Sequence, residues 1–479
     1  MSDKMNSQSG HVWEKVLSTG DVVAIAFGAM AGWGWVVSTG DWIGRGGVIG
    51  AMLGFLLGGV MIFFVGLTYA ELTSAIPETG GESIFSQRAF GPTGSFICTW
   101  GLVLGYAGVV CFEACAFPTI VSYIFPNFLQ GYLYTVAGFK IYASWLAVAI
   151  LTAIFITVIN VLGTKMAANL QTAMTLVIGA SGVLMAIAAA LEGNTANLEG
   201  QMFLGDSNGD ILRNIMRVAV ISPFFYLGFD VIPQAVEEIN VDLKKVGRIL
   251  LLSIILGAVF YTAAIFSVGC IMSPAEMEAS SLVSADAMAK AFGSKLWADL
   301  LIVGGMCGIM TTWNSFLIGA SRALFSMSER HMLPDFISIT SSKHKTPAGA
   351  IIFTGALSVV SLFFGRRMLV WVMDAGTFGC CVAYCIVAAS FLRLRKTEPD
   401  LRRPFKVRNP RFAGTMAMVM SGVMVLLFVI PGSGADFSPE EWIIAGGWIA
   451  LGVVYYVYAR MKHGNKFGVQ DWALNEKIH

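Results

Sequence analysis

Long apolar runs separated by short polar stretches dominate the chain. A helix that crosses the hydrocarbon core of a bilayer needs about 20 mostly apolar residues. The runs are continuously apolar and do not alternate, which excludes a transmembrane β-barrel and leaves a bundle of helices. We therefore predict an all-α polytopic membrane protein with twelve transmembrane helices. The predicted spans are residues 17–40, 46–70, 94–124, 141–162, 166–191, 214–236, 248–272, 296–326, 348–365, 368–392, 412–431 and 442–460.

Two of these spans contain helix-weakening residues at their centre. The first span contains the sequence GAMAGWGW (28–35), and the sixth contains SPFFYLGFDVIP (222–233). Glycine and proline both weaken a helical hydrogen-bond ladder, and broken helices at matching places in two halves of a chain indicate inverted repeats. The alternative is that the glycines only allow close helix packing, as expected for Gly50, Gly54 and Gly58.

The repeat hypothesis divides the chain into five parts. These are an N-terminal tail (1–16), repeat one with spans one to five (17–191), repeat two with spans six to ten (214–392), spans eleven and twelve (412–460), and a C-terminal tail (461–479).

Composition and charge agree with a membrane protein. Hydrophobic residues make up 56% of the chain and charged residues 13%, whereas about a quarter of residues are charged in soluble domains. The net charge of +1 leaves no excess to hold a polyanion, so nucleic acid is not an expected partner. Most of the 31 Lys and Arg residues, including the dense stretch from Arg393 to Arg411, lie on the side of the N-terminus. The positive-inside rule then predicts cytoplasmic termini in a cell (inner) membrane protein.

The N-terminus and the cysteines point to neither processing nor metal chemistry. The polar N-terminus runs into the first span without a small-residue cleavage site, so we expect this span to be retained. The eight cysteines lie in or beside apolar runs, which predicts small buried hydrophobic residues and not disulfides or a metal site.

Four segments carry a resemblance to a known family. They are YAELTSAIPETGGESIFSQRAFGP (69–92), FFYLGFDVIPQAVEEIN (224–240), SRALFSMSERHMLP (321–334) and RLRKTEPDLRRPFKV (393–407). In this order and at these places they resemble the amino acid–polyamine–organocation permeases, whose fold is that of the sodium-coupled leucine transporters. The resemblance implies a five-plus-five inverted repeat with discontinuous helices 1 and 6. It also implies a secondary transporter that works by alternating access, with spans one, three, six, eight and ten around a central site.

The break in span one is the first part of the predicted substrate site. An unwound helix offers backbone N–H groups to an anion, and in the resembling family this break receives the substrate carboxylate. The matching triplet here is Gly32, Trp33 and Gly34, in which a bulky Trp33 stands where the family has a small residue. Trp33 could instead be a packing aromatic.

Glu113 is the second part, because an ionisable residue in the middle of a span is expensive and is functional by default. It lies in VVCFEACAF, in the third span, and could hold an ammonium group or a proton. The alternative is a neutral glutamic acid hydrogen-bonded between helices.

Aromatic side chains complete the predicted site, because aromatic faces attract ammonium groups. Three of them precede the glycine of span six, and Trp313 has the spacing of a substrate-facing tryptophan in exchangers of the resembling family. The predicted substrate-binding residues are Gly28, Gly32, Trp33, Gly34, Glu113, Phe224, Phe225, Tyr226, Gly228 and Trp313.

The sequence indicates the coupling ion, H⁺ or Na⁺, less clearly than it indicates the substrate site. Glu113 and Asp230 are the candidates for proton coupling. Asp230 could instead act in hinging of span six or make a contact at a helix terminus. Thr311, Thr312 and Ser315 are candidate sodium ligands, because hard cations prefer oxygen; the alternative is that these hydroxyls bond back to their own helix. Span five has no internal Lys or Arg, and Lys165 lies at its edge, so a coupling lysine is not expected. Exchange without an ion also stays open, and no resident cofactor is expected.

The function class follows from these observations. We predict transport of a small amino acid or a related amine; a permease or exchanger for a polyamine or an ethanolamine-type amine is the alternative, and a channel or receptor is a remote one. The nucleotide loop GxxxxGK[ST], the zinc motif HExxH and a Ser/His pair within spans are all missing from the sequence, so an enzyme is not expected. The sequence does not indicate the oligomeric state.

Charged clusters flank the predicted cytoplasmic ends of the spans. Glu71, Glu78 and Glu82 lie near Arg88, and Glu237 and Glu238 precede Lys244, Lys245 and Arg248. We predict that they form cytoplasmic ion pairs that open and close with a gate; the alternative is a solvated cluster of charges at the membrane edge. On the other side, residues 273–295 are expected to contain one amphipathic helix over the entrance.

Overall fold

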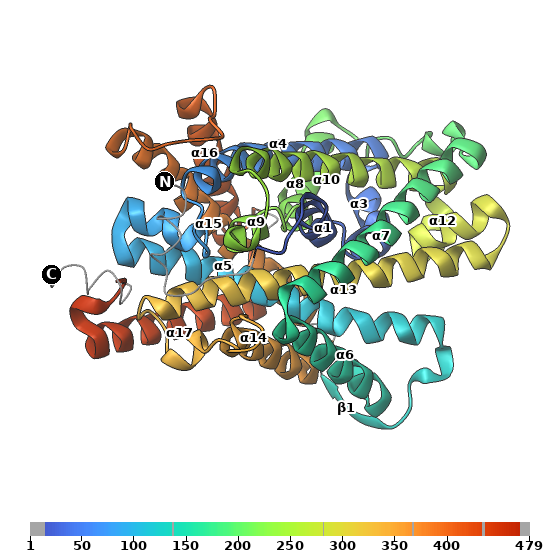
Figure 1. Cartoon of the computed structure of the whole chain (residues 1–479). Coiled ribbons are helices and arrows are strands. Elements are labelled where there is room, and N and C mark those ends of the chain that lie inside the picture. The colour runs from blue at the N-terminus through green and yellow to red at the C-terminus, as the bar shows by residue number, and fades with distance from the viewer. Residues whose placement is uncertain (1–14, 137, 281, 366–367, 434–435, 470–479) are drawn as a thin grey trace.

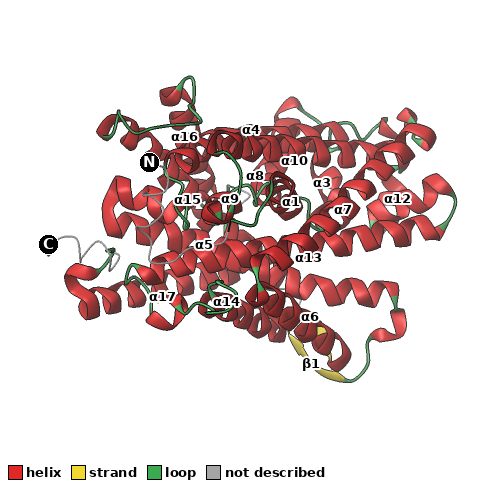
Figure 2. Cartoon of the chain, in the orientation of Figure 1, coloured by secondary structure: helices red, strands yellow, loops and turns green. Residues whose placement is uncertain are grey.

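The computed structural model describes residues 15–136, 138–280, 282–365, 368–433 and 436–469. Helices make up most of this part of the chain, and the strands in it form one antiparallel hairpin, in which Val136 pairs with Phe139. Figure 2 shows this hairpin as the small yellow element below α6. The prediction of an all-α architecture is therefore confirmed.

The elements follow one another along the chain with short connections (Figure 1). From residue 19 to 198 they are α1 (Thr19–Met30), α2 (Gly34–Val37), α3 (Thr39–Gly46), α4 (Val48–Ala75), α5 (Glu82–Ile124), η1 (Pro126–Phe128), β1 (Tyr132–Val136), β2 (Phe139–Tyr142), α6 (Ala143–Leu162), α7 (Thr164–Glu192) and η2 (Thr195–Leu198). From residue 208 to 338 they are α8 (Asn208–Phe225), α9 (Val231–Gln234), η3 (Val236–Glu238), α10 (Leu243–Ile271), α11 (Pro274–Ala279), α12 (Val283–Phe292), α13 (Lys295–Glu329) and η4 (Asp335–Ser338). The last are α14 (Ala348–Ser361), η5 (Leu362–Phe364), α15 (Met368–Thr397), α16 (Pro410–Val429), α17 (Pro439–His463) and η6 (Gly464–Lys466).

Among the described residues, ten helical segments are long and apolar enough to cross a membrane, and α14 with η5 forms a shorter apolar helix. The remaining predicted span, residues 214–236, corresponds to α8 and α9, which are interrupted and therefore short. The N-terminal part of α8 also carries Asp210, Arg213 and Arg217, which lower its hydropathy. The chain is thus a multi-pass helical membrane protein.

The two predicted interruptions are present and contact each other. The first lies between Met30 at the end of α1 and Gly34 at the start of α2, and the second lies between Phe225 and Val231. At the second, Gly228 has φ +133°, and a Cβ atom there would lie 2.5 Å from Cβ of Ala29. Only glycine tolerates both this backbone conformation and this close approach. The two unwound segments therefore meet at the centre of the bundle.

The bundle has two ends, which we name by what lies there. At the terminal end, the segment before α1 meets the segment after η3, and the chain following α17 lies there as well (Figure 1). The opposite end of the bundle, which we call the distal end, carries α3 and α12 (Figure 1). Between the ends, α1 packs against α7, α10 and α13, and α5 packs against α13 and α15.

Two predicted helices differ from the structure. The span expected to begin at residue 94 is preceded by further helix from Glu82, and the two parts join at Gly91, which has φ +75°. The prediction of a single amphipathic helix within residues 273–295 was wrong. The chain leaves the helical conformation at Ser280 and forms two helices, α11 and α12. The buried face of α12 packs on α2, where the Ser284 hydroxyl donates to the Trp35 carbonyl at 3.0 Å.

Candidate functional site

A cavity of about 410 Å³ lies at the meeting point of the two breaks. Six of the predicted substrate-binding residues line it, and they come from α5 and from both interrupted helices. These six are Gly32, Trp33, Gly34, Glu113, Phe224 and Phe225. The cavity continues towards the distal end, where its lining includes Asp41 and Arg45, whose side chains are about half exposed. It therefore reaches the surface at that end.

The first break presents free backbone donors to this cavity. The N–H groups of residues 32–35 donate no hydrogen bond to any atom of the described residues, although Trp33 and Gly34 supply their carbonyls to the following turn. N–H groups at the start of a helix carry partial positive charge. Three of these residues, Gly32, Trp33 and Gly34, line the cavity, so their N–H groups are suited to a carboxylate.

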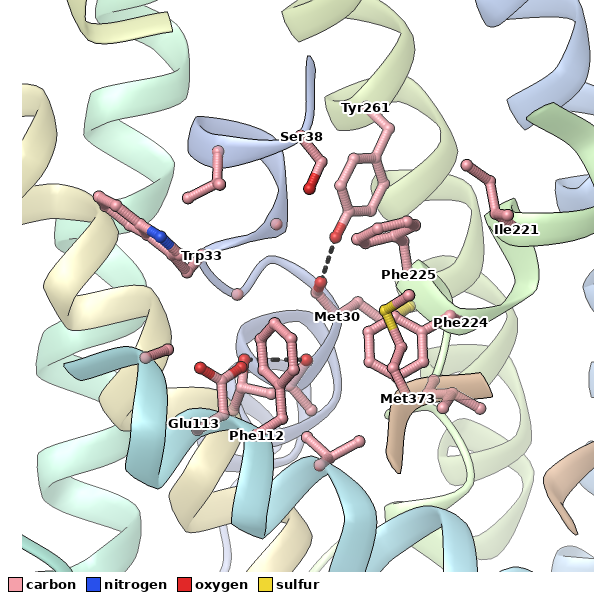
Figure 3. Close-up of a pocket in the computed structure, with 18 of the residues that line it drawn as sticks. Met30, Trp33, Ser38, Phe112, Glu113, Ile221, Phe224, Phe225, Tyr261 and Met373 are labelled. Carbon is pink, nitrogen blue, oxygen red and sulfur yellow. Dashed lines mark hydrogen bonds between the residues drawn. The ribbon is translucent and has the colours of Figure 1, made fainter. Parts of the chain in front are cut away.

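The Glu113 carboxylate lies beside these donors. Its side chain is 3% exposed, and Oε1 lies 3.3 Å from the point that a Cβ atom on Gly32 would occupy. Its other oxygen, Oε2, is buried and has no hydrogen-bond partner among the described residues. Figure 3 shows Glu113 and Phe112 side by side on α5, at the edge of the cavity. The alternative of a glutamic acid hydrogen-bonded between helices has no supporting partner in this part of the chain.

Aromatic rings form the opposite wall. Phe225 lies directly over Gly34, where a Cβ atom would come within 2.8 Å of its Cδ1. The same ring packs against Trp42, with centroids 4.7 Å apart, and against Phe224 at 5.4 Å. Gly34 therefore serves two purposes: it leaves the N–H group accessible and makes room for Phe225.

Trp33 lines the cavity, but most of its surface is buried. The side chain is 5% exposed, and its six-membered ring occupies the space that a side chain on Gly305 of α13 would need. The bulky residue at the break is thus accommodated by a glycine 272 positions later in the chain. Trp33 therefore packs against α13, as the alternative for it held, and also forms part of the cavity wall.

Several lining residues were not predicted as substrate-binding. The Tyr261 hydroxyl of α10 donates to the Met30 carbonyl at the end of α1, as the dashed line in Figure 3 shows. Phe112, Phe316 and Ser38 also line the cavity. No sequence signal marks Tyr261, because it is one aromatic residue in a continuously apolar span. Phe112 could have been found from its position next to Glu113.

Four predicted substrate-binding residues do not line the cavity. Trp313 is 1% exposed within the core, and the Tyr226 hydroxyl donates to the Phe55 carbonyl at 3.0 Å. Gly28 supplies its carbonyl to hydroxyls of α13, and Gly228 packs on α1. These four residues therefore lie buried in the protein core and not in the cavity lining.

Asp230 also lies outside the cavity, in a fully buried position. One carboxylate oxygen accepts a hydrogen bond from the Tyr384 hydroxyl of α15 at 2.7 Å, and the other accepts one from the Gly228 N–H at 2.9 Å. Asp230 therefore satisfies an N–H group of the second break and ties this break to α15.

The three hydroxyls proposed as sodium ligands all reach α1. Thr311 donates to the Gly28 carbonyl at 2.9 Å, Thr312 to the Ala29 carbonyl at 3.1 Å, and Ser315 to the Ile25 carbonyl at 3.0 Å. Hydroxyl and carbonyl oxygens thus converge between α13 and the end of α1, and Thr312 also lines the cavity. Thr311 shares its donor with Gly308 of its own helix.

On the other side of α1, α7 supplies neutral polar groups to the same helix. Gln171 and Thr175 both donate to the Ala24 carbonyl at 3.2 Å. The edge residue Lys165 instead pairs with Asp21 in the first turn of α1, with Nζ 2.8 Å from Oδ2. The lysine therefore lies near the terminal end of α1, away from its break.

At the terminal end, backbone and side-chain contacts join the segment before α1 to η3 and α13. The N–H groups of Val16 and Leu17 both donate to the Glu238 carbonyl at 3.0 Å. The Glu238 carboxylate pairs with Arg322 of α13, and both side chains are at most 2% exposed. The predicted pairing of Glu237 and Glu238 with Lys244, Lys245 and Arg248 was therefore wrong for Glu238, because the fold brings α13 closer.

The other predicted clusters form ion pairs across the terminal end. Glu71 pairs with Arg395 at 2.5 Å and with Arg403 at 3.1 Å, and Arg88 pairs with Glu398 at 2.6 Å. Glu78 approaches Arg330 at 3.9 Å. The predicted partners were on the same segment, but the observed ones come from distant segments.

Comparisons with known proteins agree with this geometry. The family model described as "Amino acid permease" matches residues 17–455. The chain is 25% identical over 459 residues to the methylthioribose transporter of Bacillus subtilis (strain 168), and 24% identical over 466 residues to the branched-chain amino acid permease BcaP of the same organism; each match covers 94% of both proteins. It is 26% identical over 398 residues to the human Asc-type amino acid transporter 1, covering 80% of this chain and 72% of that one. A match over nearly the whole chain, together with the meeting of two broken helices around a cavity, establishes that this protein belongs to the amino acid permease family of multi-pass membrane transporters.

Proposed function

We propose that this protein moves a small α-amino acid with an apolar side chain across the cell membrane by alternating access. One observation carries the proposal: Gly32, Trp33 and Gly34, whose N–H groups donate to no atom of the described residues, line the same cavity as the Glu113 carboxylate. An α-amino acid has its carboxylate and ammonium groups on the same carbon atom. A donor cradle next to a carboxylate is complementary to both groups.

The aromatic wall supports an apolar substrate side chain. Phe112, Phe224, Phe225 and Phe316 line the cavity, and burial of apolar surface against such rings contributes about 25 cal/mol per Å². The charged lining residues Asp41, Arg45 and Asp374 come from α3 and α15 towards the distal end. A volume of about 410 Å³ is in the range of small-molecule sites.

The topology we propose has twelve spans, with α8 and α9 forming span six and α14 with η5 forming span nine. Spans one to five and six to ten are the inverted repeats, which agrees with the four unbroken spans, α4 to α7, that lie between the two interrupted ones. The terminal end faces the cytoplasm, in keeping with its arginines and lysines. The state described here is then open to the outside and closed to the cytoplasm by Glu238 and Arg322.

A second candidate substrate is an amine without a carboxylate, such as a polyamine or an ethanolamine-type amine. The observation that favours it is Glu113 beside Trp33 and Phe225, because a carboxylate with aromatic faces attracts an ammonium group on its own. The names of the relatives do not decide the matter, since one of them transports methylthioribose. The free N–H groups of the first break would have no substrate partner in this case.

A thermal-shift experiment separates the two candidates. The purified protein is tested with an apolar α-amino acid, with its decarboxylated amine and with its deaminated carboxylic acid, because a ligand that binds the native state raises the melting temperature. Stabilisation by the amino acid alone is the expected result. Stabilisation by the amine to the same extent would favour the second candidate, and no stabilisation by any amino acid or amine would overturn both.

A substitution links the result to the site. Glu113→Gln keeps the size of the side chain but removes the negative charge, so we expect a loss of amino-acid binding of about tenfold or more. Glu199→Gln is the control, because Glu199 lies exposed in a loop. Unchanged affinity in Glu113→Gln would remove this residue from the substrate site.

A further inference from the structure

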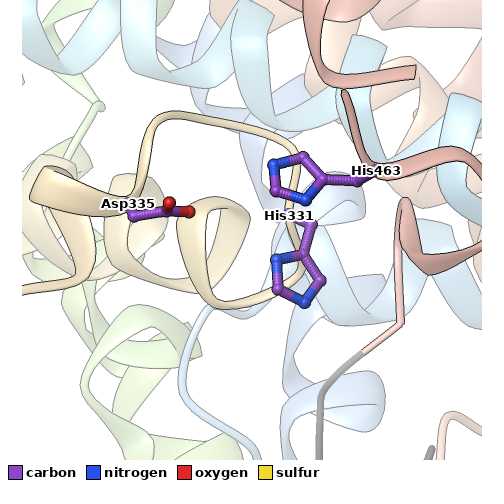
Figure 4. A group of neighbouring side chains, drawn as sticks. All are labelled: His331, Asp335 and His463. Carbon is purple, nitrogen blue, oxygen red and sulfur yellow. The ribbon is translucent and has the colours of Figure 1, made fainter. Parts of the chain in front are cut away.

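Three side chains with metal-binding atoms gather at the terminal end, far from the substrate cavity. His331 and Asp335 belong to the segment after α13, and His463 ends α17 (Figure 4). One ligand atom from each lies within 4.8 Å of the others. The imidazole rings of His331 and His463 are stacked, with centroids 4.7 Å apart and an interplanar angle of 23°.

From this cluster we infer a binding site for a zinc-like divalent transition-metal ion, formed by His331, Asp335 and His463. Two imidazole nitrogens and one carboxylate oxygen are a ligand set that zinc uses with a water in the fourth position. The set is too rich in nitrogen for magnesium or calcium, which prefer oxygen ligands.

The geometry is close to that needed. Ligand atoms around a tetrahedral zinc ion are about 3.3 Å apart for bonds of about 2.0 Å, so atoms within 4.8 Å of one another need to approach by small side-chain rotations. Asp335 has the freedom for this movement, because its side chain is 66% exposed. The histidines are half-buried, which limits the number of rotamers that they must give up.

The backbone at His331 is a second, independent observation. This residue has φ +57°, in the left-handed region where glycine is the ordinary choice. An unfavourable conformation of this kind persists where the surrounding structure enforces it and is enriched at functional sites. Here the strained turn directs an imidazole ring onto the ring of His463.

The site lies on an existing contact between two parts of the chain. Lys462 Nζ lies 3.3 Å from Asp335 Oδ2, and the Gly468 N–H donates to the Arg330 carbonyl at 2.8 Å. A bound ion would fasten the end of α17 to the loop that follows α13. Helix α13 also carries Arg322, which pairs with Glu238 at the terminal end, and Thr312, which lines the substrate cavity. The ion would have to displace Lys462 from Asp335, because a cation beside the site opposes a second one.

The test measures zinc binding to the full-length protein after any affinity tag has been removed, by calorimetry or by competition with a chromophoric chelator. One saturable zinc site per chain and a zinc-dependent rise in melting temperature are expected, with no such response to magnesium. His463→Gln should lose this binding. His344→Gln, in a loop outside the cluster, should keep it.

Two variants make the test sharper. His331→Gly removes a ligand but suits the left-handed backbone, so it should fold at least as well as the unmodified protein and still lose zinc binding. Lys462→Gln removes the competing cation and should bind zinc more tightly, which a merely structural role for the histidines would not produce. Absence of saturable zinc binding, or equal binding in His331→Gly and His344→Gln, would overturn the proposal.

Discussion

The Arg322 guanidinium donates to both carboxylate oxygens of Glu238, at 2.9 and 3.3 Å, and neither side chain is more than 2% exposed. The backbone carbonyl of Glu238 also accepts two N–H groups from the segment before α1. A single residue thus joins α13 to the start of α1. In the transport cycle proposed above, opening of the terminal end requires that these contacts break.

We expect Arg322→Gln to destabilise the described state by about 3–5 kcal/mol, because it leaves a buried carboxylate without its charged partner. The double variant Glu238→Leu with Arg322→Met should regain much of this stability, because an apolar pair needs no charge compensation. Arg322→Gln should therefore lose the closed terminal end and show impaired uptake, whereas the double variant should keep the terminal end closed more often than Arg322→Gln does. Melting temperatures and uptake assays measure the two effects.

The control for this prediction is Lys290→Gln, which breaks an exposed pair with Glu276 at the distal end. Exposed pairs contribute about 1 kcal/mol or less. An equal loss of stability in Arg322→Gln and Lys290→Gln would show that the buried pair has no special role.

Gly34→Ala should impair substrate binding, because the added methyl group meets the Phe225 ring at the cavity wall. Overpacking of this kind costs about 1–3 kcal/mol. We expect a raised KM for uptake together with a lower melting temperature. Gly44→Ala is the matched control in α3, where a Cβ atom has nothing within 4 Å. Wild-type KM in Gly34→Ala would contradict the proposed cradle.

If sodium binds between α1 and α13, then Thr312→Val should abolish stabilisation by sodium. The substitution keeps the shape of the side chain but removes an oxygen that hard cations require. Melting temperatures in equal concentrations of sodium and potassium chloride measure the effect. Thr262→Val is the control, because the Thr262 hydroxyl bonds only to its own helix. Identical melting temperatures of the unmodified protein in the two salts would argue against sodium and favour proton coupling or exchange.

Tyr384→Phe should destabilise the second break, because it removes a hydroxyl donor from the buried Asp230 carboxylate. Loss of a hydrogen bond to a buried charged or polar group costs about 1–3 kcal/mol. Tyr458→Phe, at an exposed ring on α17, should leave the melting temperature unchanged. If both variants melt at the wild-type temperature, the contact between α15 and the break does not stabilise the protein.

The pH dependence of stability should include a contribution from Glu237 at the terminal end. Burial raises the pKa of Glu237 above its ordinary value, and its neighbours Glu78 and Glu238 act in the same direction, against a hydrogen bond from Thr79. The folded protein therefore binds a proton here more readily than the unfolded chain does, so this contribution grows as the pH falls from the raised pKa towards 4.5.

Glu237→Gln imitates the protonated form at every pH. It should raise the melting temperature near neutral pH and flatten its dependence on pH in this window. Asp206→Asn, at an exposed loop position, is the control. A pH profile that is the same in both variants would show that Glu237 does not titrate in this way.

The apolar runs determined much of the fold by themselves. Their lengths require helices in a bilayer, and the glycines and prolines at residues 28–34 and 223–233 fixed where two helices break. Glu113 was recognisable because an ionisable residue in a span is costly wherever the span lies. These features are local, so they can be read along the chain.

Only the tertiary structure decided which residues share the cavity. Tyr261 reaches Met30, Gly305 makes room for Trp33, and Trp313 is turned into the core. Arg322 pairs with Glu238, in place of the basic residues that follow Glu238 in sequence. Such contacts join residues far apart in the chain and depend on how whole helices pack, and hydrophobic periodicity reports only which face of a helix is apolar, not which neighbour it meets.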